Sequence, residues 1–156
     1  MNYINIIEAW LRNYNDMELQ CESLKELYKE KELEAKEGSA IDYGKDKLSQ
    51  SYKISSETEN MALDLALLSD RIKHLDDKLN VLDKAIDRLS MKENQIIKLR
   101  YIERKRIKYT DQWRNYSWRE ISNMVGYAES WCKKIRKSAI EKLAMVMFGG
   151  KRYENH

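Results

Sequence analysis

Four basic side chains crowd one short stretch of the chain, and the chemistry open to such a cluster is the binding of a polyanion. Lys133, Lys134, Arg136 and Lys137 all follow Gly126 closely in the sequence. Lysine and arginine bind phosphates by neutralising their charge and releasing counterions. The stretch SWREISNMVGYAESWCKKIRKSAIEKLA has helical periodicity on both sides of the glycine. It therefore predicts a cationic helix that a neighbouring helix holds in position.

The charge is divided unevenly along the whole chain. Residues 1–90 hold 13 Lys/Arg and 19 Asp/Glu, whereas residues 91–156 hold 16 and 7, so the net charge of +3 combines balances of −6 and +9. This division favours a C-terminal part that faces a polyanion and an N-terminal part with another role. An acidic half docked on a basic half of the same chain remains the alternative.

The residues around Gly126 fit two helices joined by a tight turn. Ser117 and Glu120 form a capping-box pattern that opens the first helix. Ser122 supplies the small residue needed where two such helices cross. The inward positions are apolar throughout, and they fall on Ile121, Val125, Tyr127, Cys132 and Ile135. This register predicts a helix-turn-helix.

The register also divides the basic residues by role. If Cys132 and Ile135 point inward, the opposite face of the second helix can enter a DNA major groove, with its N-terminal residues at base edges. We therefore expect contacts to bases or nearby phosphates from Ser130, Lys133 and Lys134. Contacts to the DNA backbone position a protein without specifying a sequence. We expect them from Lys105, Arg106, Lys108, Arg114, Arg119, Arg136 and Lys137.

Four further side chains lie near this cluster in the sequence. Glu129 either accepts a hydrogen bond from a cytosine amino group or stabilises the helix N-terminus, and we favour the second role. Of the nearby tryptophans, Trp118 is expected in the core and Trp113 on the surface. Trp131 fits either position.

Two long amphipathic helices are expected upstream. The first is predicted over residues 3–36, and its apolar positions alternate in steps of four and three along Tyr3, Ile7, Trp10, Tyr14, Met17, Cys21, Leu24 and Tyr28. The second repeats the same heptad spacing along Met61, Leu65, Leu68, Ile72, Leu75, Leu79, Leu82, Ile86 and Leu89. Such stripes must be buried in an antiparallel hairpin, against a second copy, or both, and we expect a homodimer through these helices.

Shorter elements are expected between and after the long helices. Residues 38–57 interrupt the periodicity and form either a connector draped over the helices or a mobile recognition segment. Ser90 and Glu93 predict a capping box for a helix that buries Ile96, Ile97, Leu99, Tyr101 and Ile102. A basic, aromatic loop over residues 105–116 then leads to Ser117.

The composition agrees with an all-α fold. The chain contains no proline and five glycines, and 35% of its residues are charged, so little or no strand is expected. The predicted organisation is a long helical hairpin or coiled coil over 1–89, a helix-turn-helix domain over 90–148, and a tail over 149–156.

Several other functions are disfavoured by the sequence. The only histidines are His74 and His156, so neither a metal cluster nor a nucleophile–base pair is apparent; we expect no enzyme activity and no cofactor. Cys21 and Cys132 are expected to be buried free thiols. Because no apolar run approaches the ~20 residues of a membrane span, we expect a cytoplasmic protein with no membrane partner.

Two segments resemble a known DNA-binding domain. LSMKENQIIKLRYIERK followed by YSWREISNMVGYAESWCKKIRKSAIEKLA, about residues 89–146, resembles the helix-turn-helix (region 4) of bacterial sigma factors. With its leading helices and connector, the chain is most similar to phage late-gene transcription regulators of the ArpU/RinA type. The resemblance implies an activator that binds double-stranded DNA at the nucleoid of the bacterial host, and it leaves RNA polymerase open as a second partner.

The chain departs from the sigma-factor pattern in two places. The loop from Lys105 to Tyr116 is longer than the usual connection. Ala128 stands where a Ser or Thr N-cap is expected on the recognition helix, a replacement that costs about 1 kcal/mol of helix stability.

Two other classes of protein share parts of this pattern. A phage small terminase subunit also joins a DNA-binding helical domain to an oligomerising helix, but it forms a large ring. A coiled-coil adaptor would bind another protein and use its basic residues only for solubility. The oligomeric mass and the binding of DNA separate these alternatives from a regulator.

Overall fold

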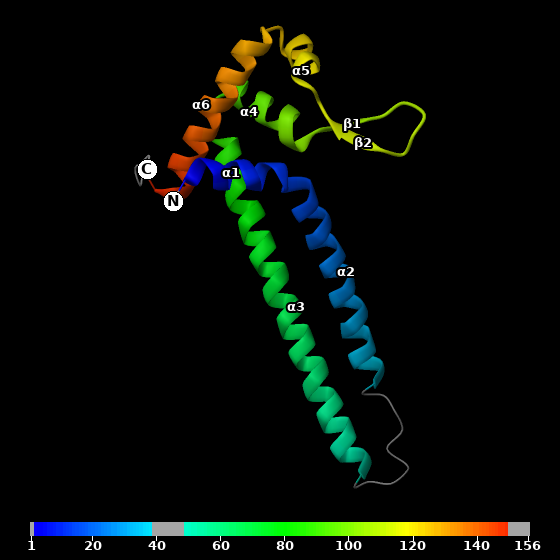
Figure 1. The fold of residues 1–156 in the computed structure, drawn as a ribbon. Coiled ribbons are helices and arrows are strands. Elements are labelled where there is room, and N and C mark those ends of the chain that lie inside the picture. Colours follow the sequence, from blue (N-terminus) through cyan, green and yellow to red (C-terminus); the bar gives the residue numbers. More distant parts are fainter. Residues whose placement is uncertain (1, 39–48, 150–156) are drawn as a thin grey trace. The chain divides into compact units, whose positions relative to one another are not determined.

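The computed structural model describes residues 2–38 and 49–149, most of which are helical (Figure 1). The helices are α1 (Tyr3–Arg12), α2 (Tyr14–Gly38), α3 (Ser49–Asp87), α4 (Met91–Ile97), the π-helix η1 (Lys98–Ile102), α5 (Trp118–Val125) and α6 (Glu129–Phe148). Two short strands, β1 (Arg104–Arg106) and β2 (Trp113–Asn115), form an antiparallel hairpin between η1 and α5. The mainly helical character that the sequence predicts is confirmed.

The described residues form two compact units, which we treat separately. The first contains residues 2–16 and 79–149, and the second contains residues 17–78. This division differs from the predicted boundary at residue 89, because α1 and the end of α3 belong with the C-terminal elements. Within the first unit α1 packs against α6, and Ile7 and Leu11 on α1 are fully buried.

The prediction of one uninterrupted helix over residues 3–36 was wrong. The chain leaves helical geometry at Asn13 (φ −94°, ψ 3°), which caps the C-terminus of α1 and donates its backbone N–H to the Ala9 carbonyl at 3.0 Å. Asparagine is a poor residue for a helix interior because its amide competes for backbone hydrogen bonds. Asn15 then donates its side-chain amide to the carbonyls of Tyr101 and Ile102 at 3.2 and 3.0 Å.

In the second unit α2 and α3 run antiparallel, side by side (Figure 1). Lys25 pairs with Asp76 at 3.1 Å, and Lys31 pairs with Asp64 at 3.5 Å, so later residues of α2 face earlier residues of α3. The buried Cys21 donates its thiol to Asp76 at 3.2 Å. The pKa of the Cys21 thiol is raised, mainly because the thiol is buried and secondly because it donates this hydrogen bond. The thiol therefore stays protonated.

The predicted bounds of the second long helix and of the connector need correction. Helix α3 begins at Ser49 and ends at Asp87, so residues 49–57 are helical, and Leu89 lies beyond the helix end. The remaining connector positions, 39–48, lie outside the described residues, as do positions 150–156 of the predicted tail.

The core beneath the cationic stretch is built from four short elements. Its fully buried side chains come from α4, η1, α5 and α6, and they are Ile96, Leu99, Ile121 and Cys132. The partly buried side chains packed against them are Tyr116, Trp118, Val125, Tyr127 and Ile135. All five positions predicted to point inward around Gly126 are therefore in or against this core.

Candidate nucleic-acid interface

The turn between α5 and α6 has the local geometry that the sequence predicts. Ser117 accepts the Glu120 N–H at 3.2 Å, and Glu120 accepts the Ser117 N–H at 3.3 Å, which completes the capping box. Gly126 closes α5 at φ 79°, in the left-handed region where glycine carries no steric cost, and donates its N–H to the Ser122 carbonyl at 2.9 Å. The Ser122 hydroxyl also donates to the Tyr127 carbonyl. The chain is thus fixed on both sides of the turn.

Helix α6 presents one face to the core and the opposite face to solvent. Cys132, Ala139 and Leu143 are buried on the inward side. At 3.6 residues per turn, Ser130 and Lys134 fall on the opposite side. Helix α6 begins at Glu129, and its N-cap residue, Ala128, supplies no side-chain cap, as the sequence indicates. The first turn of α6 therefore lacks a side chain that caps its backbone N–H groups, and its outer face is exposed to solvent.

Of the residues predicted to contact bases, Ser130 and Lys134 lie on this outer face, and Lys133 lies at its edge, near Glu8 of α1. Ser130, Lys133 and Lys134 are exposed, and so is Lys137. Within the described ranges 2–38 and 49–149, none of these three lysines makes an ion pair. Arg119, on α5, is exposed in the same way. These cations are available to an external anion without first losing an internal partner.

Arg136 differs from the other predicted backbone contacts. Its guanidinium donates to the Tyr101 hydroxyl and to the Glu8 carboxylate, both at 2.7 Å, and its side chain is only 24% exposed. Arg136 lies on the helix face that α1 covers, since its guanidinium reaches Glu8 of that helix. In this structure Arg136 joins α6 to α1 and η1, and its contact with the DNA backbone stays a prediction.

The basic loop predicted over residues 105–116 contains the β1–β2 hairpin. Lys105 and Arg114 are cross-strand partners. Both donate to the carboxylate of Glu120, Lys105 at 2.9 Å and Arg114 at 2.6 Å. Arg106 is occupied by Asp111 at 3.0 Å, whereas Lys108, at the tip, is exposed. The hairpin thus has an anchored base and a cationic tip.

Glu120 joins the hairpin to the start of α5. Hydrogen bonds from Arg114, then from Lys105, together with the Ser117 cap, lower the pKa of its carboxyl well below the ordinary value of 4.5. The sequence indicates only the capping role, because the approach of Lys105 and Arg114 depends on the register of two strands too short to predict. The charge on Glu120 is what holds like-charged Lys105 and Arg114 side by side.

We expect Glu120→Gln to loosen the hairpin while keeping α5 capped, because glutamine retains an acceptor oxygen but loses the charge. Amide exchange at Lys105 and Arg114 should speed up in the variant. Folding lowers the pKa of the Glu120 carboxyl, so the stability that its charge gives the wild-type protein is fully present above pH 4.5. This stability is lost as the pH falls toward the lowered pKa. Equal exchange in both proteins at pH 7 would contradict this role.

The aromatic residues are placed partly as expected. Trp118 packs on the core under the guanidinium of Arg100, 4.6 Å from the ring centroid, and Trp113 is 58% exposed. Trp131, which the sequence leaves open, is half-exposed on α6. Tyr109 is fully exposed at φ 65°, and sequence reasoning overlooked it. No simple signal marks it, because tyrosine is uncommon where the backbone turns left-handed.

In the described part of the chain, the His, Cys, Asp and Glu side chains form no group of three that could hold a metal ion. None of the helices in this part is long and apolar enough to cross a membrane. Both cysteine thiols are buried, as expected.

Comparisons with known proteins give no relative from which a role could be transferred. No family model, no curated protein and no solved structure matches the chain.

Proposed function

We propose that this protein is a sequence-specific DNA-binding transcription regulator in which α5, Gly126 and α6 form a helix-turn-helix. The observation that carries the proposal is the division of α6 into a buried face, on Cys132 and Leu143, and an exposed face with Ser130, Lys133 and Lys134. A helix used only for packing also exposes a polar face, but that face needs no excess of cations. Lys133 and Lys134 make no ion pair with the described residues, and a cationic face of this kind next to a tight turn fits the entry of a recognition helix into a major groove.

Binding would proceed in physically separable steps. The basic C-terminal part attracts the phosphate backbone over long range and so speeds association with DNA. Added salt screens this attraction. Arg119 and Lys137 then contact phosphates and fix the angle of α6. Lysine can donate to guanine O6 and N7, and a serine hydroxyl either donates or accepts, so Lys133, Lys134 and Ser130 would select the sequence.

The biological setting is proposed from the sequence resemblance. The resemblance to phage late-gene regulators of the ArpU/RinA type suggests an activator that acts on DNA at the bacterial nucleoid, in the cytoplasm. The region-4-like arrangement suggests that RNA polymerase is a second partner.

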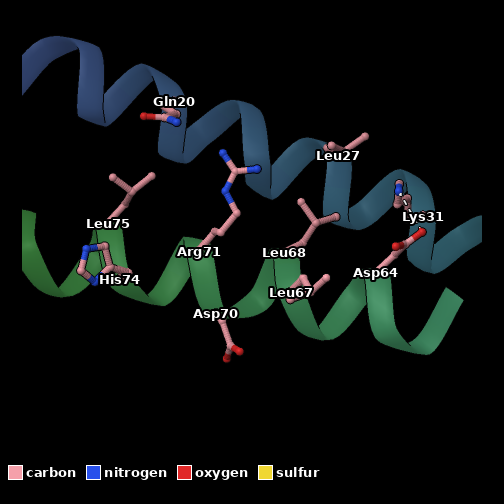
Figure 2. A pocket seen from close by; sticks show the side chains of 10 residues that line it. All are labelled: Gln20, Leu27, Lys31, Asp64, Leu67, Leu68, Asp70, Arg71, His74 and Leu75. Atoms are coloured by element: carbon pink, nitrogen blue, oxygen red, sulfur yellow. Dashed lines mark ion pairs between the residues drawn. The ribbon is translucent and has the colours of Figure 1, made fainter. Parts of the chain in front are cut away.

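We also propose that the second unit binds another copy of itself. A groove of about 750 Å³ lies between α2 and α3. Figure 2 shows the side chains that line it, in which Leu27, Leu67, Leu68 and Leu75 lie among polar groups. Leu67, which lies beside the α3 heptad positions, is 55% exposed, and the heptad positions Leu65, Ile72 and Leu75 are only partly buried. A heptad pattern that its own hairpin covers incompletely is typical of helices that associate further. A second α2–α3 hairpin would cover these leucines and give a homodimer.

The oligomeric mass separates this proposal from its rivals. A dimer fits a regulator that reads two half-sites, whereas a large ring would favour a small terminase subunit that packages DNA. A dimer that does not bind DNA would favour a protein-interaction adaptor. The mass measured by light scattering on the purified protein therefore distinguishes a dimer from a large ring before any DNA sequence is tested.

We expect the affinity for duplex DNA to fall steeply with salt. If the five exposed cations Lys108, Arg119, Lys133, Lys134 and Lys137 all neutralise phosphates, the slope of log K against log salt is about −4.5 per chain. Fluorescence anisotropy between low and physiological salt measures it. A slope near zero, or equal affinity for every sequence under all conditions, would contradict specific DNA binding.

A further inference from the structure

The β1–β2 hairpin has features that the proposed helix-turn-helix does not explain. Residues 104–115 contain five basic side chains and one acidic side chain, Asp111. Within the first unit the hairpin extends away from the helices, and its loop forms the outer end (Figure 1). A loop that only connects η1 to α5 needs neither this projection nor this charge.

The tip of the hairpin is ordered by its own hydrogen bonds. The Ile107 N–H donates to the Gln112 carbonyl at 2.9 Å, and the Thr110 N–H donates to the Ile107 carbonyl at 3.2 Å. The Thr110 hydroxyl donates to the same carbonyl at 3.0 Å, and Arg106 donates to the Thr110 carbonyl at 3.2 Å. This network holds Lys108 and Tyr109 at the outermost position of the turn.

Tyr109 occupies a position that tyrosine is poorly suited to fill. Its φ of 65° lies in the left-handed region, where glycine or asparagine is favoured, and its ring is fully exposed. A large aromatic side chain at this position is stabilised neither by the backbone conformation nor by a buried contact. Unfavourable backbone geometry of this kind is most common at binding sites, where the side chain has an external use.

We propose that this hairpin is a wing that places Lys108 and Tyr109 in the DNA minor groove beside the major groove entered by α6. The inference rests on the proposed DNA-binding function and adds to it a second reading element. The paired strands are too wide for a minor groove of about 6 Å, because a two-stranded ribbon fits the wider major groove, so only the side chains of the turn, Lys108 and Tyr109, enter it. The minor groove also attracts cations, and apolar or aromatic side chains can contact its sugars and base edges.

The orientation of the wing follows from its anchored base. Only Tyr116 and Ser117 separate β2 from α5, and Glu120 binds Lys105 and Arg114 at the base of the hairpin. The wing is thereby tied to the first helix of the proposed helix-turn-helix. The proposal requires that, when α6 docks, the tip reaches a neighbouring groove of the same duplex.

Duplex DNA is a better fit for the tip than an acidic protein surface. The exposed groups of the tip combine one cation with one flat ring at the end of a narrow projection, and a flat surface can contact only one face of that ring. A groove covers both faces of the ring and offers phosphates to Lys108 on either side.

The test uses the full-length protein and a duplex selected by the wild type. Tyr109→Gly removes the ring and relieves the positive φ, so the variant should be at least as stable as the wild type. Its affinity should nevertheless fall about fivefold or more. Tyr109→Phe keeps the ring and should retain most of the affinity. Lys108→Ala should reduce the magnitude of the salt slope by about one.

Hydroxyl-radical footprinting supplies the second readout. The wild type should protect a minor-groove segment next to the central site, and Tyr109→Gly should lose this protection while keeping the central one. If the wild type binds the duplex and the Tyr109→Gly footprint and affinity are unchanged, the wing is refuted and the helix-turn-helix stands. If the wild type itself has no specific site, the proposed function fails. If Tyr109→Gly weakens only single-stranded DNA binding, the minor-groove assignment is overturned.

Discussion

Replacing both Lys133 and Lys134 with alanine should abolish the preference of the protein for its selected DNA over random duplex. The two side chains lie on the exposed face of α6, and a lysine donating to a guanine contributes about 1–3 kcal/mol of discrimination. Two such losses correspond to a drop in specificity of roughly 30-fold or more. The measurement is the ratio of affinities for specific and random duplexes at fixed salt.

Thermal unfolding of the same variant provides the structural control. Since Lys133 and Lys134 make no ion pair within the described residues, their removal should leave the melting temperature nearly unchanged. Lys29→Ala with Lys73→Ala removes the same charge from the exposed surface of the second unit and should preserve specificity. Unfolding of the Lys133/Lys134 variant, or equal loss of specificity in the control, would contradict the proposed orientation of α6.

Leu67→Asp should convert the protein from dimer to monomer without unfolding it. Leu67 is 55% exposed in a single chain and lines the groove between α2 and α3, so an isolated hairpin tolerates a carboxylate there. Covering the same position with a second copy would bury an unpaired charge, at a cost of several kcal/mol. Light scattering should show the mass halved, while circular dichroism shows the helical content retained.

Leu82→Asp is the matched variant on the same helix, with a different expected outcome. Leu82 is 0% exposed within one chain, so a carboxylate there should lower the melting temperature sharply. A wild type that is already monomeric at micromolar concentration would contradict self-association. If Leu82→Asp melts like the wild type, the C-terminal end of the α3 stripe is not buried as the structure describes.

The parts of the fold that depend on neighbouring residues were predictable from the sequence. The capping box of Ser117 and Glu120, the turn at Gly126 and the inward positions of Ile121 and Cys132 all follow from side chains within one or two helical turns. Periodicity reports these relations directly, because each residue's partner is nearby in the chain. The exposed face of α6 follows from the same periodicity.

The parts that depend on distant residues were not predictable. The interruption at Asn13 separates α1, which packs against α6, from α2, yet the heptad spacing runs from Tyr3 to Tyr28 without a break. In the sequence Arg136 looks like the neighbouring surface cations, because its partners Glu8 and Tyr101 are far away along the chain. Composition and spacing carry no information about such long-range pairings.

The hairpin illustrates a second limit. Strands of three residues are too short to give a recognisable alternation of apolar and polar residues. In the sequence, the charges of Lys105 and Arg114 indicate a solvated loop, and only the structure shows that both side chains bind Glu120. The conformation of Tyr109 is likewise a property of the closed turn rather than of the residue.

Affinity cleavage from the start of α6 tests the central claim most directly. Because Cys21 and Cys132 are buried, a cysteine introduced by Ser130→Cys is the reactive thiol to which an iron chelate can be attached, and Lys73→Cys provides the labelled control. If α6 enters the major groove, the label at residue 130 should cut the selected duplex at one narrow position within the footprint, and the label at residue 73 should not. Bound DNA that the residue 130 label leaves intact, or cuts no more locally than the control does, would contradict the assignment of α6 as the recognition helix.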